Sequence, residues 1–216
     1  MRIARFVILT GLVLLLGPTD GPLPRPAAAN PEIEISAVIL TREIVRMDVA
    51  PDSVVVRGVY SFRRLGTSHV CPLYFPFPRD SVAVRPRLVN ASVKPGTEDY
   101  EPLHVNTRQT PWFAEVLTSD ADSFTVSLLY SQRVDAARAS YPLTSRYPWF
   151  IPCEWIQIDV AMLAGTFEPE FSLPFSSGTD GGGTTTYSWT SDGPLPDQDM
   201  DLTWHRSVDT EMRGHR

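Results

Sequence analysis

The sequence predicts an all-β protein, an antiparallel β-sandwich of about ten strands with an immunoglobulin-like or related Greek-key arrangement. Three observations predict this class. Apolar and polar residues alternate with a period of two along most of the chain between residues 31 and 205. Twenty prolines in 216 residues leave few windows that are long enough for a helix. Segments rich in Pro, Asp, Ser and Gly separate the alternating runs, as turns between strands do.

The clearest local prediction is a β-hairpin over residues 43–64. Val45, Met47 and Val49 lie in one phase of the alternation before the turn segment at 50–53, and a second alternating run follows that turn. Further strands are expected at 33–35, 73–77, 82–84, 113–117, 124–130, 154–162, 184–190 and 199–205, and a single short helical segment at 134–140.

The start of the chain has the pattern of a secretory signal peptide, which we assign to residues 1–29. Arg2 and Arg5 make it positive, residues 6–16 form an apolar run, and three alanines at 27–29 offer a cleavage site. The apolar run is too short to cross a bilayer, because a spanning helix needs about 20 residues. The mature protein is therefore expected to be secreted or periplasmic, in the cell envelope, and not to span the membrane after cleavage.

The rest of the chain is expected to be one domain. Residues 30–205 form the predicted β-sandwich, and residues 206–216 form a polar, disordered tail. No low-complexity linker interrupts the alternating part. Two smaller sandwiches that divide near residues 98–111 are the alternative. Hydrophobic residues make up 43% of the chain, which is enough for a sizeable core in either arrangement.

The two cysteines of the chain, Cys71 and Cys153, are expected to form a disulfide. Export places them in an oxidising compartment, where a pair of cysteines commonly bridges. Cys71 shares the apolar phase of Leu73 and Phe75, whereas Cys153 is out of phase with the strand that follows it. The bridge therefore requires that Cys153 lies before the regular alternation begins. Two buried free thiols are the alternative.

Charge and motif spacing exclude several functions. A net charge of −6 argues against nucleic acid as a partner. The Gly-rich segment 176–186 lacks the lysine and the following helix of a phosphate site, so it is interpreted as a loop that joins strands. Ser68 lacks the context of a catalytic nucleophile. The spacing that opens a calcium loop is present in Asp197, Asp199 and Asp201, but the rest of that motif is absent. These acids therefore indicate the solvent-exposed face of a strand. The sequence predicts no catalytic residue, no metal site, no cofactor and no enzyme.

Trp155 is the candidate exposed aromatic for binding. It lies in the phase of the polar residues Gln157 and Asp159, which predicts that it faces away from the core unless a second sheet covers it. An exposed tryptophan can stack on sugar rings or on a partner protein. For a carbohydrate-acting site it would need a pair of carboxylates nearby, such as Glu154 and Asp199.

One segment resembles a known family of extracellular domains. A strand that ends in Tyr-x-Phe, followed by a Phe-Pro-x-Pro segment, is similar to the opening of vault/inter-alpha-trypsin-type domains and of related uncharacterised bacterial secreted domains. The residues that carry this resemblance are Tyr60, Phe62, Phe75, Pro76 and Pro78. It implies a secreted, non-catalytic β-sandwich used in surface assembly or protein contact, and it implies no functional residues.

These observations together predict an exported, non-catalytic β-sandwich protein that presents a surface for protein contact or envelope assembly. The partner is an unknown protein or envelope component. The alternative is a carbohydrate-binding or carbohydrate-acting module that uses an exposed tryptophan and carboxylates.

Overall fold

Every regular element in the described part of the chain is a β-strand. The computed structural model describes residues 38–65, 69–75, 86–109, 111–118, 121–134, 137–143, 153–164, 166–179, 183–192 and 198–206. All of them belong to one compact unit, Glu34–Arg216. The expected signal peptide, the strands at 33–35 and 82–84, and residues 207–216 of the expected tail lie outside the described residues.

The described residues form thirteen strands, against about ten in the prediction. In chain order they are β1 (Val38–Val49), β2 (Ser53–Arg64), β3 (Val70–Phe75), β4 (Arg87–Pro95), β5 (Glu101–Pro102), β6 (Trp112–Leu117), β7 (Ser123–Arg133), β8 (Arg138–Tyr141), β9 (Trp155–Leu163), β10 (Phe167–Phe171), β11 (Ser176–Thr179), β12 (Thr184–Ser191) and β13 (Met200–Arg206).

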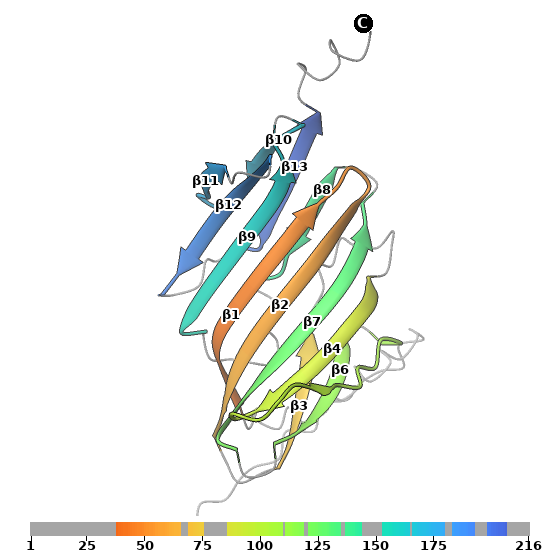
Figure 1. Ribbon diagram of the computed structural model, residues 1–216, viewed down its shortest axis with the longest axis vertical. Coiled ribbons are helices and arrows are strands. Elements are labelled where there is room, and N and C mark those ends of the chain that lie inside the picture. The colour runs from red at the N-terminus through yellow and green to blue at the C-terminus, as the bar shows by residue number, and fades with distance from the viewer. Residues whose placement is uncertain are drawn as a thin grey trace, which may run out of the picture. The chain divides into compact units, whose positions relative to one another are not determined.

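The strands form one large sheet and two small ones. The large sheet has eight strands in the order β11-β12-β9-β1-β2-β7-β4-β5, and the small sheets have the orders β10-β13-β8 and β3-β6. Figure 1 shows the large sheet in front, with β8 and β13 of one small sheet and β3 and β6 of the other behind it. The predicted all-β sandwich is confirmed, with a second layer that is divided between two sheets.

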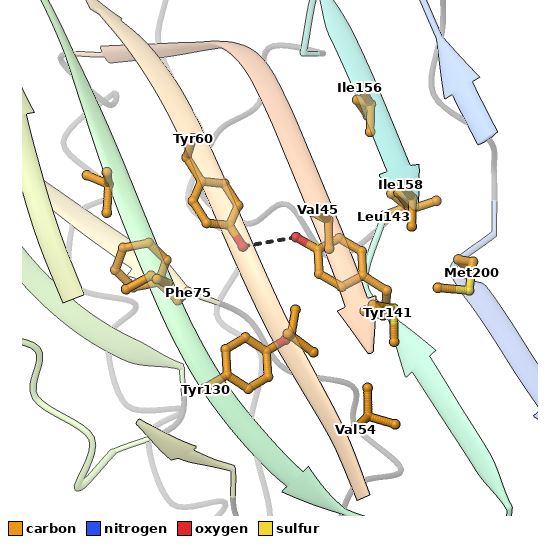
Figure 2. Packing of buried hydrophobic residues seen from close by; sticks show 14 of the residues in the cluster. Val45, Val54, Tyr60, Phe75, Tyr130, Tyr141, Leu143, Ile156, Ile158 and Met200 are labelled. Atoms are coloured by element: carbon orange, nitrogen blue, oxygen red, sulfur yellow. Dashed lines mark hydrogen bonds between the residues drawn. The ribbon is translucent and has the colours of Figure 1, made fainter. Parts of the chain in front are cut away.

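The core lies between these layers and consists of the side chains from one phase of each strand. Both small sheets pack on the same face of the large one: the ring of Trp112 in β6 meets that of Tyr130 in β7, and the hydroxyl of Tyr141 in β8 meets that of Tyr60 in β2. Figure 2 shows part of the core from close by, with Tyr60, Tyr130 and Tyr141 among the labelled side chains. Burying one large aliphatic or aromatic side chain in such a core contributes about 1.5–3 kcal/mol.

The predicted hairpin and its inward phases are confirmed. β1 and β2 pair antiparallel around the turn at 50–53, where the Ala50 N–H donates to the Ser53 carbonyl at 2.8 Å. β9 and β13 also follow the predicted alternation, whereas in β12 Tyr187 and Trp189 share the inward phase of β9 but are only half-buried. The inward side chains of β9 and β13 are buried: Ile156, Ile158, Val160, Met162, Met200, Leu202 and Trp204.

The prediction of a wholly antiparallel sandwich is wrong for one pair of strands. β9 runs parallel to β1, with Arg42 aligned with Trp155 and Asp48 with Ala161. More than a hundred residues separate the aligned positions, so β9 enters the sheet after several intervening strands. Alternation records which face a residue occupies and carries no information about strand direction. All other paired strands in the described ranges are antiparallel.

The sequence prediction missed β4 and β10 for identifiable reasons, and it missed β5, which has only two residues. The pairing of β4 with β7 shifts register between Leu88 and Asn90, and such a bulge breaks the period of two. β10 carries Pro169 at its centre, which argues against a strand inside a sheet. It is tolerated because β10 is an edge strand of its small sheet.

Three boundary predictions also need correction. The expected helical segment at 134–140 ends in strand β8, which starts at Arg138 after Ala137 with a positive φ of 48°. The expected loop at 176–186 begins with strand β11, which pairs with β12. Arg206, assigned to the tail, is the last residue of β13. Short strands of four residues carry too little alternation to be separated from loops or from one helical turn.

Gly58 is expected to be the glycine most sensitive to substitution. A Cβ atom there would collide with the ring of Tyr60, which lies against the glycine and cannot withdraw because its hydroxyl meets that of buried Tyr141. Gly58→Ala should lower the free energy of unfolding by about 1–3 kcal/mol. Gly178→Ala is the matched control, because nothing lies within 4 Å of that Cβ position. Urea denaturation of both variants measures the difference, and equal midpoints would contradict the prediction.

Candidate functional site

As predicted, Trp155 lies on the face of the large sheet that points away from the two small sheets. Its side chain is half-buried there and not fully exposed. The guanidinium carbon of Arg42 lies 4.5 Å from the centroid of its ring. This contact follows from the parallel pairing of β1 and β9, which places the two residues side by side. A cation over an indole ring at such a site contributes about 0.5–1 kcal/mol.

The outward side chains of the large sheet form rows across β9, β1, β2, β7 and β4, and we call this surface the outer face. Cross-strand register defines the rows, because directly paired residues point to the same side of a sheet. The rows are Trp155, Arg42, Ser61, Thr125 and Lys94; then Gln157, Ile44, Val59, Ser127 and Ser92; then Asp159, Arg46, Arg57, Leu129 and Asn90; then Asp48, Val55, Ser131 and Arg87.

The outer face carries more positive than negative charge, although the chain as a whole is acidic at −6. Asp48 and Asp159 are the carboxylates of these rows. The cations of the same rows are Arg42, Arg46, Arg57, Arg87 and Lys94. Positive charge is therefore concentrated on one face, against the sign of the rest of the molecule.

The acids of the outer face are held by their neighbours. Asp48 pairs with Arg57 and, at 3.0 Å, with Arg46. Asp159 accepts hydrogen bonds at 2.6 Å from both the Gln157 amide and the Ser188 hydroxyl. These carboxylates order the surrounding polar side chains, so the outer face has a defined arrangement of charge.

Asp48→Asn is expected to destabilise the protein modestly and in a salt-dependent way. Arg46 and Arg57 are direct cross-strand partners, and like charges in that position repel unless an anion lies between them. Removing the Asp48 charge should lower the free energy of unfolding by about 0.5–1 kcal/mol, because exposed ion pairs contribute little. The loss should shrink at high salt. Thermal unfolding at two ionic strengths measures it; a loss independent of salt would contradict the electrostatic origin.

Arg42 and Lys94 differ from the paired arginines. In the described ranges no carboxylate lies within salt-bridge distance of either side chain; the contact of Arg42 is the Trp155 ring, and that of Lys94 is the Tyr100 ring, 5.7 Å from its ammonium nitrogen. Stacking on a ring satisfies none of the guanidinium N–H donors, which lie at the edge of the group. These donors are available to an anion from outside.

The pair of carboxylates considered for carbohydrate chemistry has separate structural roles. Glu154 pairs with Arg63 at 3.3 Å. One carboxylate oxygen of Asp199 accepts the Leu143 backbone N–H at 2.8 Å. Asp201 pairs with Arg138 at 3.3 Å, whereas Asp197 and Ser68 lie outside the described residues. Within the described part of the chain, no group of three or more His, Cys, Asp or Glu side chains is placed to hold a metal ion.

The disulfide expected between Cys71 and Cys153 is absent, and both residues are buried free thiols. Cys71 points inward from β3 and hydrogen-bonds Thr118; burial raises the pKa of its thiol, an effect that this bond and Arg64 partly offset. Cys153 donates to the Trp155 carbonyl at 3.0 Å, immediately before β9. The two thiols lie in different parts of the sandwich, and each has its own hydrogen-bond partner. This is the alternative of two buried free thiols that the sequence left open.

A buried carboxyl and phenol cluster is the feature that sequence reasoning missed. Glu43 is only 3% exposed, and it accepts a hydrogen bond of 2.5 Å from the Tyr141 hydroxyl. Because the proton of Tyr141 is used there, Tyr60 donates to Tyr141 in the contact of 3.0 Å drawn in Figure 2. The signal was present: Glu43 shares the inward phase of Val45, Met47 and Val49.

The cluster connects the two layers of the sandwich. Glu43 and Tyr60 belong to the large sheet, whereas Tyr141 belongs to the small sheet of β8, β10 and β13. Burial raises the pKa of both Tyr141 and Tyr130 well above its usual range, and the nearby Glu43 charge adds to the effect. The phenols therefore stay protonated as hydrogen-bond donors, and we assign the cluster a structural role.

The small β3–β6 sheet has an apolar surface on its outward side. Val70 and Leu117 are cross-strand partners and are 43% and 70% exposed. Farther along the same side, beyond the pair of Pro72 and exposed Glu115, the rings of Tyr74 and Phe113 lie 5.1 Å apart. Exposed apolar side chains that adjoin one another are more common at interaction surfaces than elsewhere on a soluble protein.

Comparison with solved structures places the fold among known proteins. An M1 zinc metallopeptidase from Deinococcus radiodurans is similar over 77% of this chain and 42% of its own, with 13% identity and a TM-score of 0.51. A mutant of the M1 zinc metallopeptidase bound to a Tyr-Ser-Ala substrate matches with 12% identity and a TM-score of 0.50. At this identity the likeness concerns the fold alone. The present chain spans less than half the length of these chains.

No protein-family model matches the chain, and no curated protein matches it in sequence. The resemblance to vault/inter-alpha-trypsin-type domains therefore stays a prediction. In the described part of the chain, no helix has the length and apolar character needed to cross a bilayer.

Proposed function

We propose that this chain is an exported, non-catalytic β-sandwich module that works by contact with another protein. The observation that carries the proposal is the outer face, an ordered surface whose charge is opposite in sign to that of the whole chain. Concentrated charge of one sign steers a complementary partner and selects its orientation. A merely solvated sheet face needs no such segregation.

The composition of the outer face also supports protein contact. Arg and Trp are enriched at protein interfaces, where they contribute much of the binding energy. Between the charged rows lies a half-buried aliphatic pair, Ile44 and Val59, which are direct cross-strand partners. An apolar centre with a polar rim is the usual organisation of an interface. The apolar side of the β3–β6 sheet provides additional surface of the same kind.

The structural neighbour is compatible with a module of this type. In the Deinococcus radiodurans metallopeptidase the matched region is 42% of the chain, so there the fold is part of a longer polypeptide. The zinc chemistry in the neighbour's name is not part of this proposal.

The carbohydrate alternative has less support. A sugar platform requires an open aromatic face, and Arg42 covers one face of Trp155. Glu154 and Asp199 are engaged with different partners, as described above. Glycan-array binding that is lost in Trp155→Ala would favour the carbohydrate module over protein contact.

Export predicts a defined processing product. If residues 1–29 are a signal peptide, the mature chain should begin at Asn30, because a peptidase cleaves after the small residues at 27–29. Intact-mass and N-terminal measurements on protein recovered from the periplasm or medium test this. Recovery of the unprocessed chain in the cytosol would contradict export, whereas a start elsewhere between residues 17 and 35 would correct the cleavage position.

Site-specific photocrosslinking in the native host tests protein contact. A photoreactive residue at Ser127, in the row of the outer face that contains Ile44 and Val59, should form a discrete protein adduct. The same residue at Glu168, an exposed position on edge strand β10, is the matched control. Arg57→Glu in the Ser127 background should abolish the adduct by reversing charge in the adjacent row. Equal adducts at both positions, or none at Ser127, would overturn the proposal.

A further inference from the structure

We infer that the outer face binds an acidic polypeptide segment and that Arg42, stacked on Trp155, is its anchor. This inference rests on the proposed function and specifies the chemistry of the partner. It follows from the kind of cation present, from the state of Arg42, from the spacing of the rows and from what the face lacks.

The cations of the outer face are arginines with the exception of Lys94, which is the single lysine of the sequence. A guanidinium is planar and offers N–H donors in a fork that matches the two oxygens of a carboxylate. A point charge such as an ammonium attracts any anion, whereas the fork gives direction to the contact. Each guanidinium of this face can therefore hold a carboxylate in a fixed orientation.

Arg42 is prepared for such a contact. Its guanidinium carbon lies over the Trp155 ring, 4.5 Å from the centroid, and this contact restricts the side chain before any ligand arrives. In the described ranges it has no carboxylate partner, unlike Arg46 and Arg57, which share Asp48. A ligand carboxylate at Arg42 replaces no internal ion pair, and little side-chain freedom is lost on binding.

The spacing of the first row suits an extended chain. Arg42 and Lys94 are separated by Ser61 and Thr125, that is by three strand spacings of about 4.8 Å, or about 14 Å in total. An extended polypeptide advances about 13 Å over four residues. A segment that crosses the strands therefore brings acidic side chains four residues apart to Arg42 and Lys94, with hydroxyl groups between them.

The same surface is poorly suited to a lipid bilayer. Binding at a membrane interface needs apolar side chains that insert below the headgroups. One exposed large hydrophobic residue, Leu163, shares the outward phase of β9 at the end of that strand, and the others of the described chain lie outside the rows and their strand phases: Leu65, Val70, Val89, Tyr100 and Leu117. The aliphatic residues within the rows are half-buried between charged ones, where side chains of a bound polypeptide can cover them.

A binding experiment with purified mature protein tests the inference. The probe is a fluorescein-labelled peptide of ten glutamates, measured by anisotropy at low ionic strength, with a ten-residue Gly-Ser peptide as the uncharged reference. Arg42→Gln should weaken glutamate-peptide binding about tenfold, the effect of losing one charged, bidentate contact. Arg108→Gln, which removes the same charge from an exposed loop position, should change it less than twofold.

Several results would overturn the inference. One is absence of binding to the glutamate peptide, and another is an equal loss in Arg42→Gln and Arg108→Gln, which would reflect net charge alone. A third is tighter binding to phosphatidylglycerol–phosphatidylcholine vesicles than to the peptide, with the same dependence on Arg42. If any of these occurs while the Ser127 adduct persists, the partner's chemistry is wrong and the proposed protein contact stands.

Discussion

Glu43→Ala is expected to lower the free energy of unfolding by about 2–4 kcal/mol. The substitution leaves a cavity in the core and removes the acceptor of the Tyr141 hydroxyl, whose proton is then buried without that partner. Glu115→Ala on β6 is the matched control, because Glu115 is exposed and its loss should cost less than about 0.5 kcal/mol. Urea denaturation followed by tryptophan fluorescence measures both values.

A double-mutant cycle separates the hydrogen bond from the cavity. Tyr141→Phe alone should cost about 1–3 kcal/mol, because it leaves the buried carboxyl of Glu43 without its 2.5 Å donor. Glu43→Leu combined with Tyr141→Phe should cost less than the sum of Glu43→Leu and Tyr141→Phe measured separately, since both polar groups are absent from the double variant. Strict additivity would show that the two groups do not interact and would contradict the structural role assigned to the cluster.

Alkaline pH is expected to destabilise the protein steeply. The pKa values of Tyr141 and Tyr130 are raised well above their usual range, chiefly by burial. In the unfolded chain these phenols lose their protons near pH 10, whereas in the folded protein they keep them. Their contribution to stability is therefore complete below about pH 10 and is lost as pH rises toward the folded values, by about 1.4 kcal/mol per pH unit for each phenol.

The measurement is the free energy of unfolding between pH 9 and pH 12. Tyr141→Phe should make the free energy of unfolding fall less steeply with pH above about pH 10, by the contribution of one phenol. Tyr100→Phe, at an exposed position, should leave this pH dependence unchanged. The raised pKa of the Cys71 thiol adds a contribution that begins near pH 9. A flat profile up to pH 12, or equal slopes in the two variants, would disprove the role of the buried phenols.

Much of the fold was predictable because alternation records burial directly. The hairpin of β1 and β2, the inward phase of β9 and the burial of Trp204 all follow from it. The failures occurred where this local code is interrupted. A bulge in β4, a proline in edge strand β10 and the four-residue strand β11 each leave too few consecutive residues in phase.

The candidate site was predictable only in part. The phase of Trp155 correctly placed it on the outer face, and the phases of Arg57 and Arg63 placed them on a polar side of β2. That Arg42 stacks on Trp155 was not predictable, because the contact depends on which strand lies next to β9 and in which direction it runs. The gathering of cations into one surface likewise depends on strand order across the whole sheet.

The sequence by itself determined the all-β class, the hairpin and the inward or outward phase of most strands, because an alternation with a period of two can be read from consecutive residues. The tertiary structure alone decided the parallel β1–β9 pair, the burial of Glu43 against Tyr141 and the stacking of Arg42 on Trp155. Each of these joins residues about a hundred positions apart. Their contact depends on the order and direction of strands, which local alternation does not encode.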